Sequence, residues 1–315
     1  MRFNSSRLRC PLTGWNNPRR FFLFFITALV FISFPTPLFS KGSQEHNNSA
    51  LRTFVSIAPQ AYLLQRIGGN RVSVGVLVQE GQDPHIFDPT PSTMARLSEA
   101  DLYFRIGVEF EQALLERIAT AAPELEIIDC RENIILREIE MDDAHEADHH
   151  EEHDGADPHI WMSVRNTITI STTIYKALVD LDPEGRSVYQ EGYDSLVNEL
   201  ISLDNELTRI LEPVKGRKLF VFHPAFGYFA HDYGLHQVAV EIGGNEPSAR
   251  QLAQVIDEAK NQGARVIFVQ PQFSRKSAQA VADAIEGAVV PIDSLAMDYI
   301  ENMKTIAVAV EEGLQ

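Results

Sequence analysis

The residues best suited to chemistry in this chain are three histidines that each lie beside a proline. They occur in two similar tripeptides, Asp83-Pro84-His85 and Asp157-Pro158-His159, and in the dipeptide His223-Pro224. Imidazole is the commonest protein ligand for transition metals, and a neighbouring proline restricts the backbone freedom that is lost when the ring is fixed. Three such histidines, far apart in the sequence, predict a metal site that the fold brings together.

Asp293 is a fourth candidate ligand, because it shares with two of the histidines a position just beyond a predicted strand. The strands concerned are Ser73–Val78 before His85, Lys218–Phe222 before His223 and Val289–Ile292 before Asp293. In open parallel sheets, ligands bind beyond the carboxyl ends of the strands. His159 instead lies just before a helical run that begins near Ser163. Two candidates come from each half of the chain, so we expect the site between two lobes.

This set of four candidates favours zinc. Three imidazoles and one carboxylate form a four-coordinate set of nitrogen and oxygen ligands that suits Zn²⁺, whereas Mn²⁺ prefers more oxygen ligands. The other histidines outside the acidic loop described next share neither the flanking proline nor the strand-end position; they are His46, His231 and His236. We therefore leave these three out of the predicted site.

A stretch of histidines and acids from Asp142 to Asp154 breaks the pattern of the chain. It contains His145, His149, His150 and His153, and no apolar residue larger than alanine. Such a segment cannot pack into a core, and we expect a mobile surface loop. Two interpretations stay open: a solvated charged loop, and an accessory site that binds divalent metals with low affinity.

Strands and helices alternate in both halves of the chain around these residues. The predicted strands are Thr53–Ile57, Ser73–Val78, Asp101–Ile106, Leu125–Asp129, Lys218–Phe222, Gln237–Val240, Arg265–Val269 and Val289–Ile292. The predicted helices are Pro59–Ile67, Ser92–Ala100, Glu109–Ala121, Phe226–Tyr233, Ser248–Gln262, Ser274–Ile285 and Met297–Glu312. The alternation is typical of α/β proteins, and each half is predicted to form a small parallel sheet with helices on its faces.

One long helix is predicted between the two halves, from about Pro183 to Leu211. Its apolar residues recur at steps of three and four, as in one continuous stripe; they are Tyr189, Tyr193, Leu196, Leu200, Leu203, Leu207 and Ile210. A helix of this length spans roughly 42 Å at 1.5 Å per residue. We expect it to run across both lobes as a stiff connection, and an edge helix of one lobe is the alternative.

The composition limits the classes of partner. The 315 residues carry a formal net charge of −17, which argues against nucleic acid and against an anionic membrane surface as partners.

The first forty residues contain five arginines and no acid, and the last of these arginines is followed by an apolar run from Phe21 to Phe34. This order predicts a secretory signal peptide, and an uncleaved membrane anchor is the alternative. Cys130 would be the single cysteine of the exported chain, so we expect no internal disulfide.

These patterns predict five segments along the chain. They are a signal peptide at 1–40, a disordered segment at 41–52, an N-terminal metal-binding lobe at 53–182 that carries the loop 142–154, a linking helix at 183–212, and a C-terminal metal-binding lobe at 213–315.

The chain resembles the cluster 9 metal-binding proteins of ABC importers, the periplasmic zinc and manganese receptors. The resemblance runs from about Thr53 to Gly313. Its motifs are Gly81-Gln82-Asp83-Pro84-His85 with Pro89-Thr90-Pro91-Ser92, Asp157-Pro158-His159-Ile160-Trp161, Phe222-His223-Pro224-Ala225-Phe226-Gly227-Tyr228-Phe229, Glu246-Pro247-Ser248 and Pro271-Gln272-Phe273. It implies two lobes of four-stranded parallel sheet joined by one rigid helix, with the metal held between them by His85, His159, His223 and Asp293.

Within this family, histidine at the third ligand position accompanies zinc receptors and glutamate accompanies manganese receptors, so His223 implies zinc. The acidic, histidine-rich loop also resembles the zinc branch. The chain departs from the family pattern at two places. Gln270 stands where the family often has glutamate, and Asp293-Ser294-Leu295-Ala296 replaces the usual Asp-Pro-Leu-Gly, which bears on the position of Asp293.

The function predicted from the sequence is capture of Zn²⁺ in the periplasm and delivery to an ABC transporter permease, by a monomeric receptor that is not an enzyme. A manganese or ferrous iron receptor is the nearest alternative. A secreted zinc hydrolase is the alternative from another class, since a site of three histidines without Asp293 leaves a coordination position for water. An adhesin or a structural protein gives no reason for histidines at strand ends.

Overall fold

The computed structural model describes residues 50–139, 156–241, 247–273 and 275–315. Several predictions therefore lie outside the described residues: the signal peptide, the disordered segment as far as residue 49, and the loop 142–154 with His145, His149, His150 and His153. Within the described residues, no helix is both long enough and apolar enough to cross a membrane.

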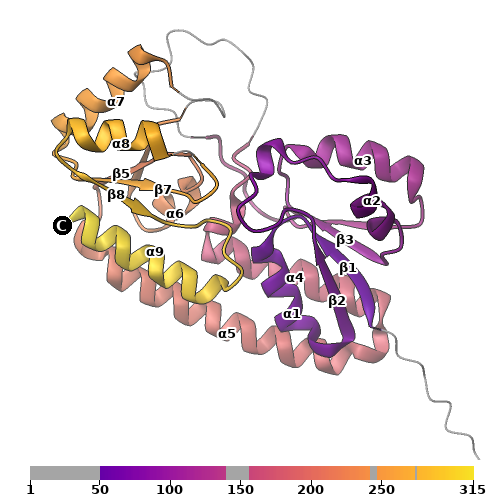
Figure 1. Ribbon diagram of the computed structural model, residues 1–315. Coiled ribbons are helices and arrows are strands. Elements are labelled where there is room, and N and C mark those ends of the chain that lie inside the picture. The colour runs from indigo at the N-terminus through magenta and orange to yellow at the C-terminus, as the bar shows by residue number, and fades with distance from the viewer. Residues whose placement is uncertain (1–49, 140–155, 242–246, 274) are drawn as a thin grey trace, which may run out of the picture. The chain divides into compact units, whose positions relative to one another are not determined.

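The first half of the chain forms a parallel sheet of four strands in the order β2-β1-β3-β4 (Figure 1). The strands are β1 (Leu51–Val55), β2 (Val72–Val76), β3 (Leu102–Arg105) and β4 (Glu126–Asp129). The helices that alternate with them are α1 (Ala58–Gly68), α2 (Pro91–Ser98) and α3 (Phe110–Ala121). Parallel neighbours need a crossover connection, and these helices supply it. The alternation predicted from the sequence is confirmed here.

The second half repeats the same strand order, β6-β5-β7-β8, again with all pairs parallel. The strands are β5 (Lys218–Val221), β6 (His236–Ala239), β7 (Val266–Val269) and β8 (Ala288–Pro291). The helices are α6 (Gly227–Asp232), α7 (Ala249–Asn261), α8 (Arg275–Ala284) and α9 (Tyr299–Leu314). The predicted fold class, two four-stranded parallel sheets flanked by helices, is confirmed.

The second sheet is buried on both faces, as a parallel sheet requires. Along β7, Ile267 and Val269 pack with residues of α7 and α8, whereas Phe268 between them packs in a cluster that includes residues of α9. This alternation follows from the period of two in strand side chains. With both faces covered, the carboxyl edge of the sheet is left for binding a ligand.

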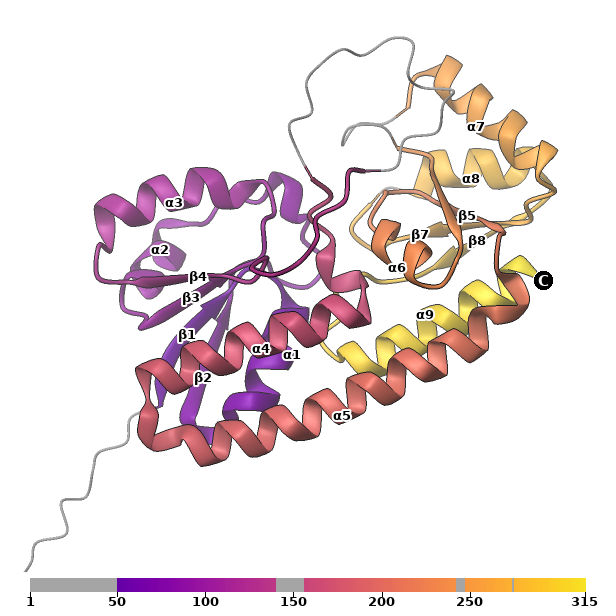
Figure 2. The same ribbon diagram turned by 180° about the vertical axis from the view of Figure 1, so that it is seen from behind.

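Two helices connect the sheets, α4 (Val164–Leu181) and α5 (Arg186–Leu211). The apolar stripe of α5 is buried at Tyr189, Leu196, Leu200, Leu203, Leu207 and Leu211. The helix packs against α1 and α4 of the first half and against α9 of the second half, and both views show it passing along these helices (Figures 1 and 2). The predicted long helix is therefore present and contacts both halves.

Prolines lie just outside both ends of α5. Pro183 begins a separate 3₁₀ turn (Pro183–Gly185), and α5 itself starts at Arg186. A second 3₁₀ turn containing Pro213 (Glu212–Val214) follows the last residue of α5. Proline lacks the N–H that a continuing α-helix needs, so the helix ends before it.

The first strand begins two residues before the boundary expected for the disordered segment. Leu51 and Arg52 were predicted to lie in the disordered segment, but both belong to β1 and pair in register with Val72 and Ser73 of β2. The backbone N–H of Arg52 also donates to Asp101 Oδ2 at 2.8 Å. Hydrogen bonds on both sides of Arg52 therefore hold it in the sheet.

Candidate metal centre

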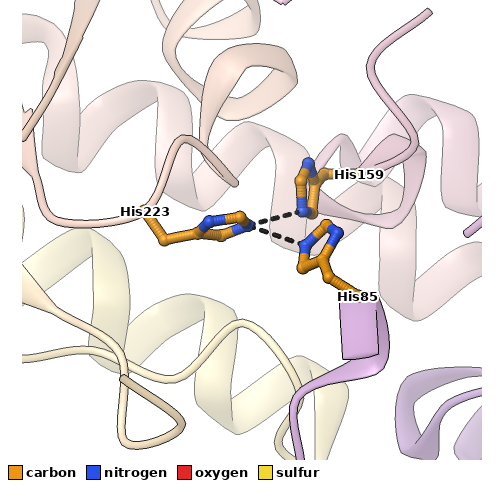
Figure 3. A group of neighbouring side chains, drawn as sticks. All are labelled: His85, His159 and His223. Carbon is orange, nitrogen blue, oxygen red and sulfur yellow. Dashed lines mark hydrogen bonds between the residues drawn. The ribbon is translucent and has the colours of Figure 1, made fainter. Parts of the chain in front are cut away.

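The three proline-flanked histidines meet at one point. His85 Nε2 lies 2.9 Å from His223 Nε2, which lies 3.2 Å from His159 Nε2. Figure 3 shows the three rings converging from three separate segments of the chain. Their ligand atoms all lie within 4.8 Å of one another, close enough to hold one metal ion. A tetrahedral zinc with Zn–N bonds of 2.0–2.1 Å would place two nitrogens about 3.3 Å apart, so His223 would need to separate from His85 and His159 by only a few tenths of an ångström.

The two Asp-Pro-His tripeptides fold into the same local turn. The backbone N–H of His85 donates to Asp83 Oδ1 at 2.8 Å, and the backbone N–H of His159 donates to Asp157 Oδ1 at 2.9 Å. An aspartate that accepts from the backbone two residues on forms an Asx turn, and the proline between fixes one backbone torsion. The motif therefore restrains the backbone of each histidine through contacts within the tripeptide itself.

Each imidazole uses its other ring nitrogen to contact a carboxylate. The Nδ1 atoms of His85, His159 and His223 lie 2.7, 2.7 and 3.1 Å from oxygens of Glu109, Asp157 and Glu241, respectively. An ionised carboxylate offers only acceptors, so a proton on each Nδ1 would satisfy these contacts and would leave each Nε2 lone pair for a metal at the shared point. Carboxylate partners of this kind orient metal-binding histidines and raise their basicity.

Burial differs sharply among the three rings. The side chains of His159 and His223 are only 4% and 7% exposed, whereas the side chain of His85 is 18% exposed and that of its partner Glu109 is 57% exposed. The ring of His223 also stacks on Phe273, with centroids 4.4 Å apart. His159 and His223 are thus held more tightly than His85.

The environment shifts the pKa values of two of the rings in opposite directions. Burial, together with the neighbouring His159 and His85, holds the pKa of His223 well below its ordinary value. Burial also lowers the pKa of His85, but the hydrogen bond and charge of Glu109, with Asp83 and Glu241, outweigh it and raise that pKa. The pKa of Glu109 is lowered: burial opposes ionisation, and the hydrogen bond to His85 prevails. His223 is therefore a neutral imidazole at neutral pH, which is the form that binds metals.

The segment that carries His159 is fastened to the second half of the chain. Tyr228 donates its hydroxyl to the Asp157 carbonyl at 3.1 Å, and Trp161 Nε1 donates to the Ser294 carbonyl at 2.7 Å. A Cβ atom added to Gly227 would lie 2.7 Å from Asp157 Oδ2, so the carboxylate occupies the space that the missing side chain leaves. His159 therefore belongs spatially with His223, although it precedes the long helix in the sequence.

Asp293 lies outside the group of three. Its Oδ1 accepts from Gln272 Nε2 at 3.0 Å and from the backbone N–H of Leu295 at 2.9 Å, and among the described residues the cluster of ligand atoms within 4.8 Å contains only the histidines. His231 is largely exposed and contacts Asp232, and His236 begins β6.

Sequence reasoning missed two of the carboxylates that orient the rings. Glu241 directly follows the predicted strand Gln237–Val240, so the strand-end rule that selected His223 and Asp293 could have found it. Glu109 lies immediately before α3, after the end of β3, and satisfies the same rule. Neither stands beside a proline, which was the signal that selected the histidines.

Comparison with known proteins places this geometry in context. The family model described as zinc-uptake complex component A, periplasmic, matches residues 54–313. A crystal structure of ZnuA is 40% identical and superposes with a TM-score of 0.78, covering 85% of this chain and all of that one.

Two curated relatives name different metals. The high-affinity zinc uptake system protein ZnuA of Paracoccus denitrificans is 30% identical over 270 residues, covering 75% of this chain and 80% of its own length. The manganese-binding lipoprotein MntA of Halalkalibacterium halodurans is 25% identical over 268 residues, covering 83% of this chain and 84% of its own. Both zinc and manganese proteins are therefore among the chains that this one resembles.

Proposed function

Since the chain belongs to the family of periplasmic zinc-uptake complex component A, we propose that it captures Zn²⁺ as its substrate outside the inner membrane and delivers it to an ABC transporter permease. The observation that supports this best is the convergence of three Nε2 atoms whose partner nitrogens are each held by a carboxylate. The resemblance to a zinc uptake protein of Paracoccus denitrificans points the same way.

The proposed ligands are His85, His159 and His223, with Asp293 as the fourth. Both hydrogen bonds accepted by the Asp293 carboxylate go to Oδ1, which leaves Oδ2 as the oxygen proposed to complete the site. A set of three nitrogens and one oxygen matches the tetrahedral coordination that zinc prefers. Water in the fourth position is the alternative to Asp293.

Zinc is proposed over manganese and ferrous iron on the chemistry of the donor set. Three imidazoles favour Zn²⁺, and Mn²⁺ prefers sites richer in oxygen. The resemblance to a manganese-binding lipoprotein keeps the second metal as the alternative. Competition of Zn²⁺, Mn²⁺ and Fe²⁺ for the metal-free protein distinguishes them, and tighter binding of Mn²⁺ than of Zn²⁺ would exclude the zinc assignment.

The site is proposed to bind and release its metal and not to catalyse a reaction. The family to which the chain belongs consists of solute-binding receptors. A catalytic zinc keeps a coordination position open for water, so the rival hydrolase predicts activity of the zinc-loaded protein on ester, peptide or phosphate substrates. Such activity, lost in His223→Ala, would favour the hydrolase.

The export signal, the two lobes, the linking helix and the histidine-rich loop each have a role in this proposed function. Residues 1–40 would direct export to the periplasm, and the mature receptor would act as a monomer on its permease. The proposed metal-binding lobes extend over 53–182 and 213–315, with 183–212 as the linking helix. The loop with His145, His149, His150 and His153 would act as a low-affinity collector or sensor of metal.

The decisive experiment is to measure the metal content and stoichiometry of the purified protein, with and without His223→Ala. One tightly bound Zn²⁺ per chain in the wild type, and its loss in the variant, is the expected result. A wild-type protein that binds no transition metal would overturn the proposed function.

A further inference from the structure

The main chain of His223 lies just beyond the end of the hydrogen-bond ladder of its sheet. The last regular bond on one side of β5 runs from the Phe222 N–H to the Phe268 carbonyl at 2.7 Å. The next residue is His223, which is 5% exposed, and after it comes Pro224, which has no N–H. Buried backbone groups at such a strand end need partners from elsewhere.

A single side chain supplies both partners. The backbone N–H of His223 donates to Gln270 Oε1 at 3.3 Å, and Gln270 Nε2 donates to the His223 carbonyl at 2.8 Å. That carbonyl also accepts from the Ala225 N–H at 2.8 Å. Gln270 directly follows β7, the neighbour of β5, and is fully buried. Its amide thus replaces the backbone pairing that would continue the ladder by one residue.

This contact needs one donor and one acceptor on the same side chain. Asparagine and glutamine combine the two in a planar fork at any pH, whereas an ionised carboxylate has only acceptors and an aliphatic side chain has neither. Gln270 holds the backbone of His223, while Glu241 and Phe273 hold its ring. With both ends fixed, the position of Nε2 relative to His85 and His159 is determined.

We propose that Gln270 is a positioning residue of the metal centre, which sets the affinity for the metal by fixing the main chain of His223. This inference rests on the proposed function, because it requires His223 to be a metal ligand. Gln270 touches no metal in this scheme and acts only through His223.

The first sheet provides a matched control for this role. Gln60 is also buried, and its Oε1 accepts from the backbone N–H groups of Ser56 and Ile57 at 3.1 and 3.3 Å. Its Nε2 donates to the Phe104 carbonyl at 3.1 Å. Gln60 therefore satisfies the backbone beyond the end of β1 much as Gln270 does beyond β5, but it contacts no histidine in the described residues. Removing its amide should cost the same kind of hydrogen bonds without moving a ligand.

The test compares Gln270→Met with Gln60→Met in the purified protein. The measurements are Zn²⁺ affinity by competition with a chromophoric chelator, the visible spectrum of the Co²⁺-loaded protein, and thermal unfolding without metal. Both variants should unfold at lower temperature. Only Gln270→Met should weaken Zn²⁺ binding, by about 10- to 100-fold as for other supporting partners of metal ligands, and only it should change the Co²⁺ bands.

The inference would be overturned if Gln270→Met bound Zn²⁺ within about twofold of wild type and left the Co²⁺ bands unchanged. Such a change is well short of the loss that removal of a supporting partner usually causes. An equal loss in Gln60→Met would also overturn the inference. If Gln270→Met does not fold, Gln270→Asn serves instead, since its amide is one methylene too short to reach both groups of His223. Failure of the proposed function would appear separately, as a wild-type protein without stoichiometric zinc.

Discussion

The two Asp-Pro-His tripeptides share three residues and one turn, yet they are held in different ways. In Asp157-Pro158-His159, one aspartate oxygen accepts from both the backbone N–H and the ring Nδ1 of the histidine, and the histidine is buried. In Asp83-Pro84-His85, the aspartate bonds only the backbone, and the ring relies on Glu109, which is largely exposed. The same local motif thus fixes the backbone in both places, and the tertiary surroundings decide how firmly the ring is held.

This difference in burial bears on which ligands are in place before Zn²⁺ binds. His159 and His223 form a buried pair, because the His159 segment is fastened to the second half of the chain through Tyr228 and Trp161. His85 approaches that pair from the first half with an exposed partner. We expect the buried pair to be the preformed part of the site and His85 to be the ligand that completes it.

The largest expected effect is a difference in Zn²⁺ affinity between variants of His159 and His85. His159→Ala should weaken Zn²⁺ binding by more than about 100-fold, because it destroys the preformed pair, whereas His85→Ala should cost about 10- to 100-fold, comparable to the loss of a supporting partner. Isothermal titration of both variants with Zn²⁺ measures the two losses. His231→Ala, which removes an exposed histidine outside the cluster, is the control and should bind like wild type. Equal losses for His85 and His159 would contradict the comparison.

The next effect concerns the aspartates of the tripeptides. Asp157→Ala removes a bond to the backbone and a bond to the ring, so it should weaken Zn²⁺ binding by about 10- to 100-fold. Asp83→Ala removes only the backbone bond and should cost about 1 kcal/mol of stability with a smaller loss of affinity. Chelator competition and thermal unfolding of the two variants give these quantities. If Asp83→Ala weakened binding as much as Asp157→Ala, the ring contact of Asp157 would have no special role.

The features of the fold and site that the sequence predicts are those set by residues close together in the chain. The strands and helices could be predicted, because alternating and three-to-four periodic apolar residues reflect local geometry. The three histidines could also be selected, because the flanking prolines and the strand ends are visible in the sequence. The strand-end rule could have selected Glu109 and Glu241 as candidates, but the sequence could not show which histidine each of them contacts. Glu109 lies 24 residues from His85 and Glu241 lies 18 from His223, and only the packing of the sheets brings each pair together.

The half of the chain against which His159 packs could be found only from the fold. From its position before the long helix, the sequence predicts that His159 groups with His85 in the first half of the chain. The structure places it against residues of the second half, since Asp157 fits over Gly227 and Trp161 bonds Ser294. A residue without a Cβ is unremarkable in a sequence, and its meaning appears only when the carboxylate that occupies its space is seen.

Gly227 therefore offers a third way to test the comparison. In Gly227→Ala the new Cβ would lie 2.7 Å from Asp157 Oδ2, and the carboxylate whose Oδ1 contacts His159 must shift. We expect a loss of about 1–3 kcal/mol in stability from overpacking and a moderate loss of Zn²⁺ affinity. A double-mutant cycle with Asp157→Ala checks the cause, because removing the carboxylate should relieve part of the lost stability. Purely additive losses in unfolding free energy would place the strain elsewhere.

The smallest expected effect is that of deleting 142–154, the segment that precedes the second tripeptide. His159 is held by contacts that do not involve this segment: the turn at Asp157, the hydroxyl of Tyr228 and the bond from Trp161. If those contacts are sufficient, the deletion should leave one tight zinc site with an affinity within about threefold of wild type, well short of the change caused by losing a supporting partner. Any weaker binding by His145, His149, His150 and His153 should disappear from the titration. Loss of the tight site on deletion would mean that Asp157-Pro158-His159 depends on the loop. The firmer hold on His159 than on His85 would then be due to the loop and not to burial.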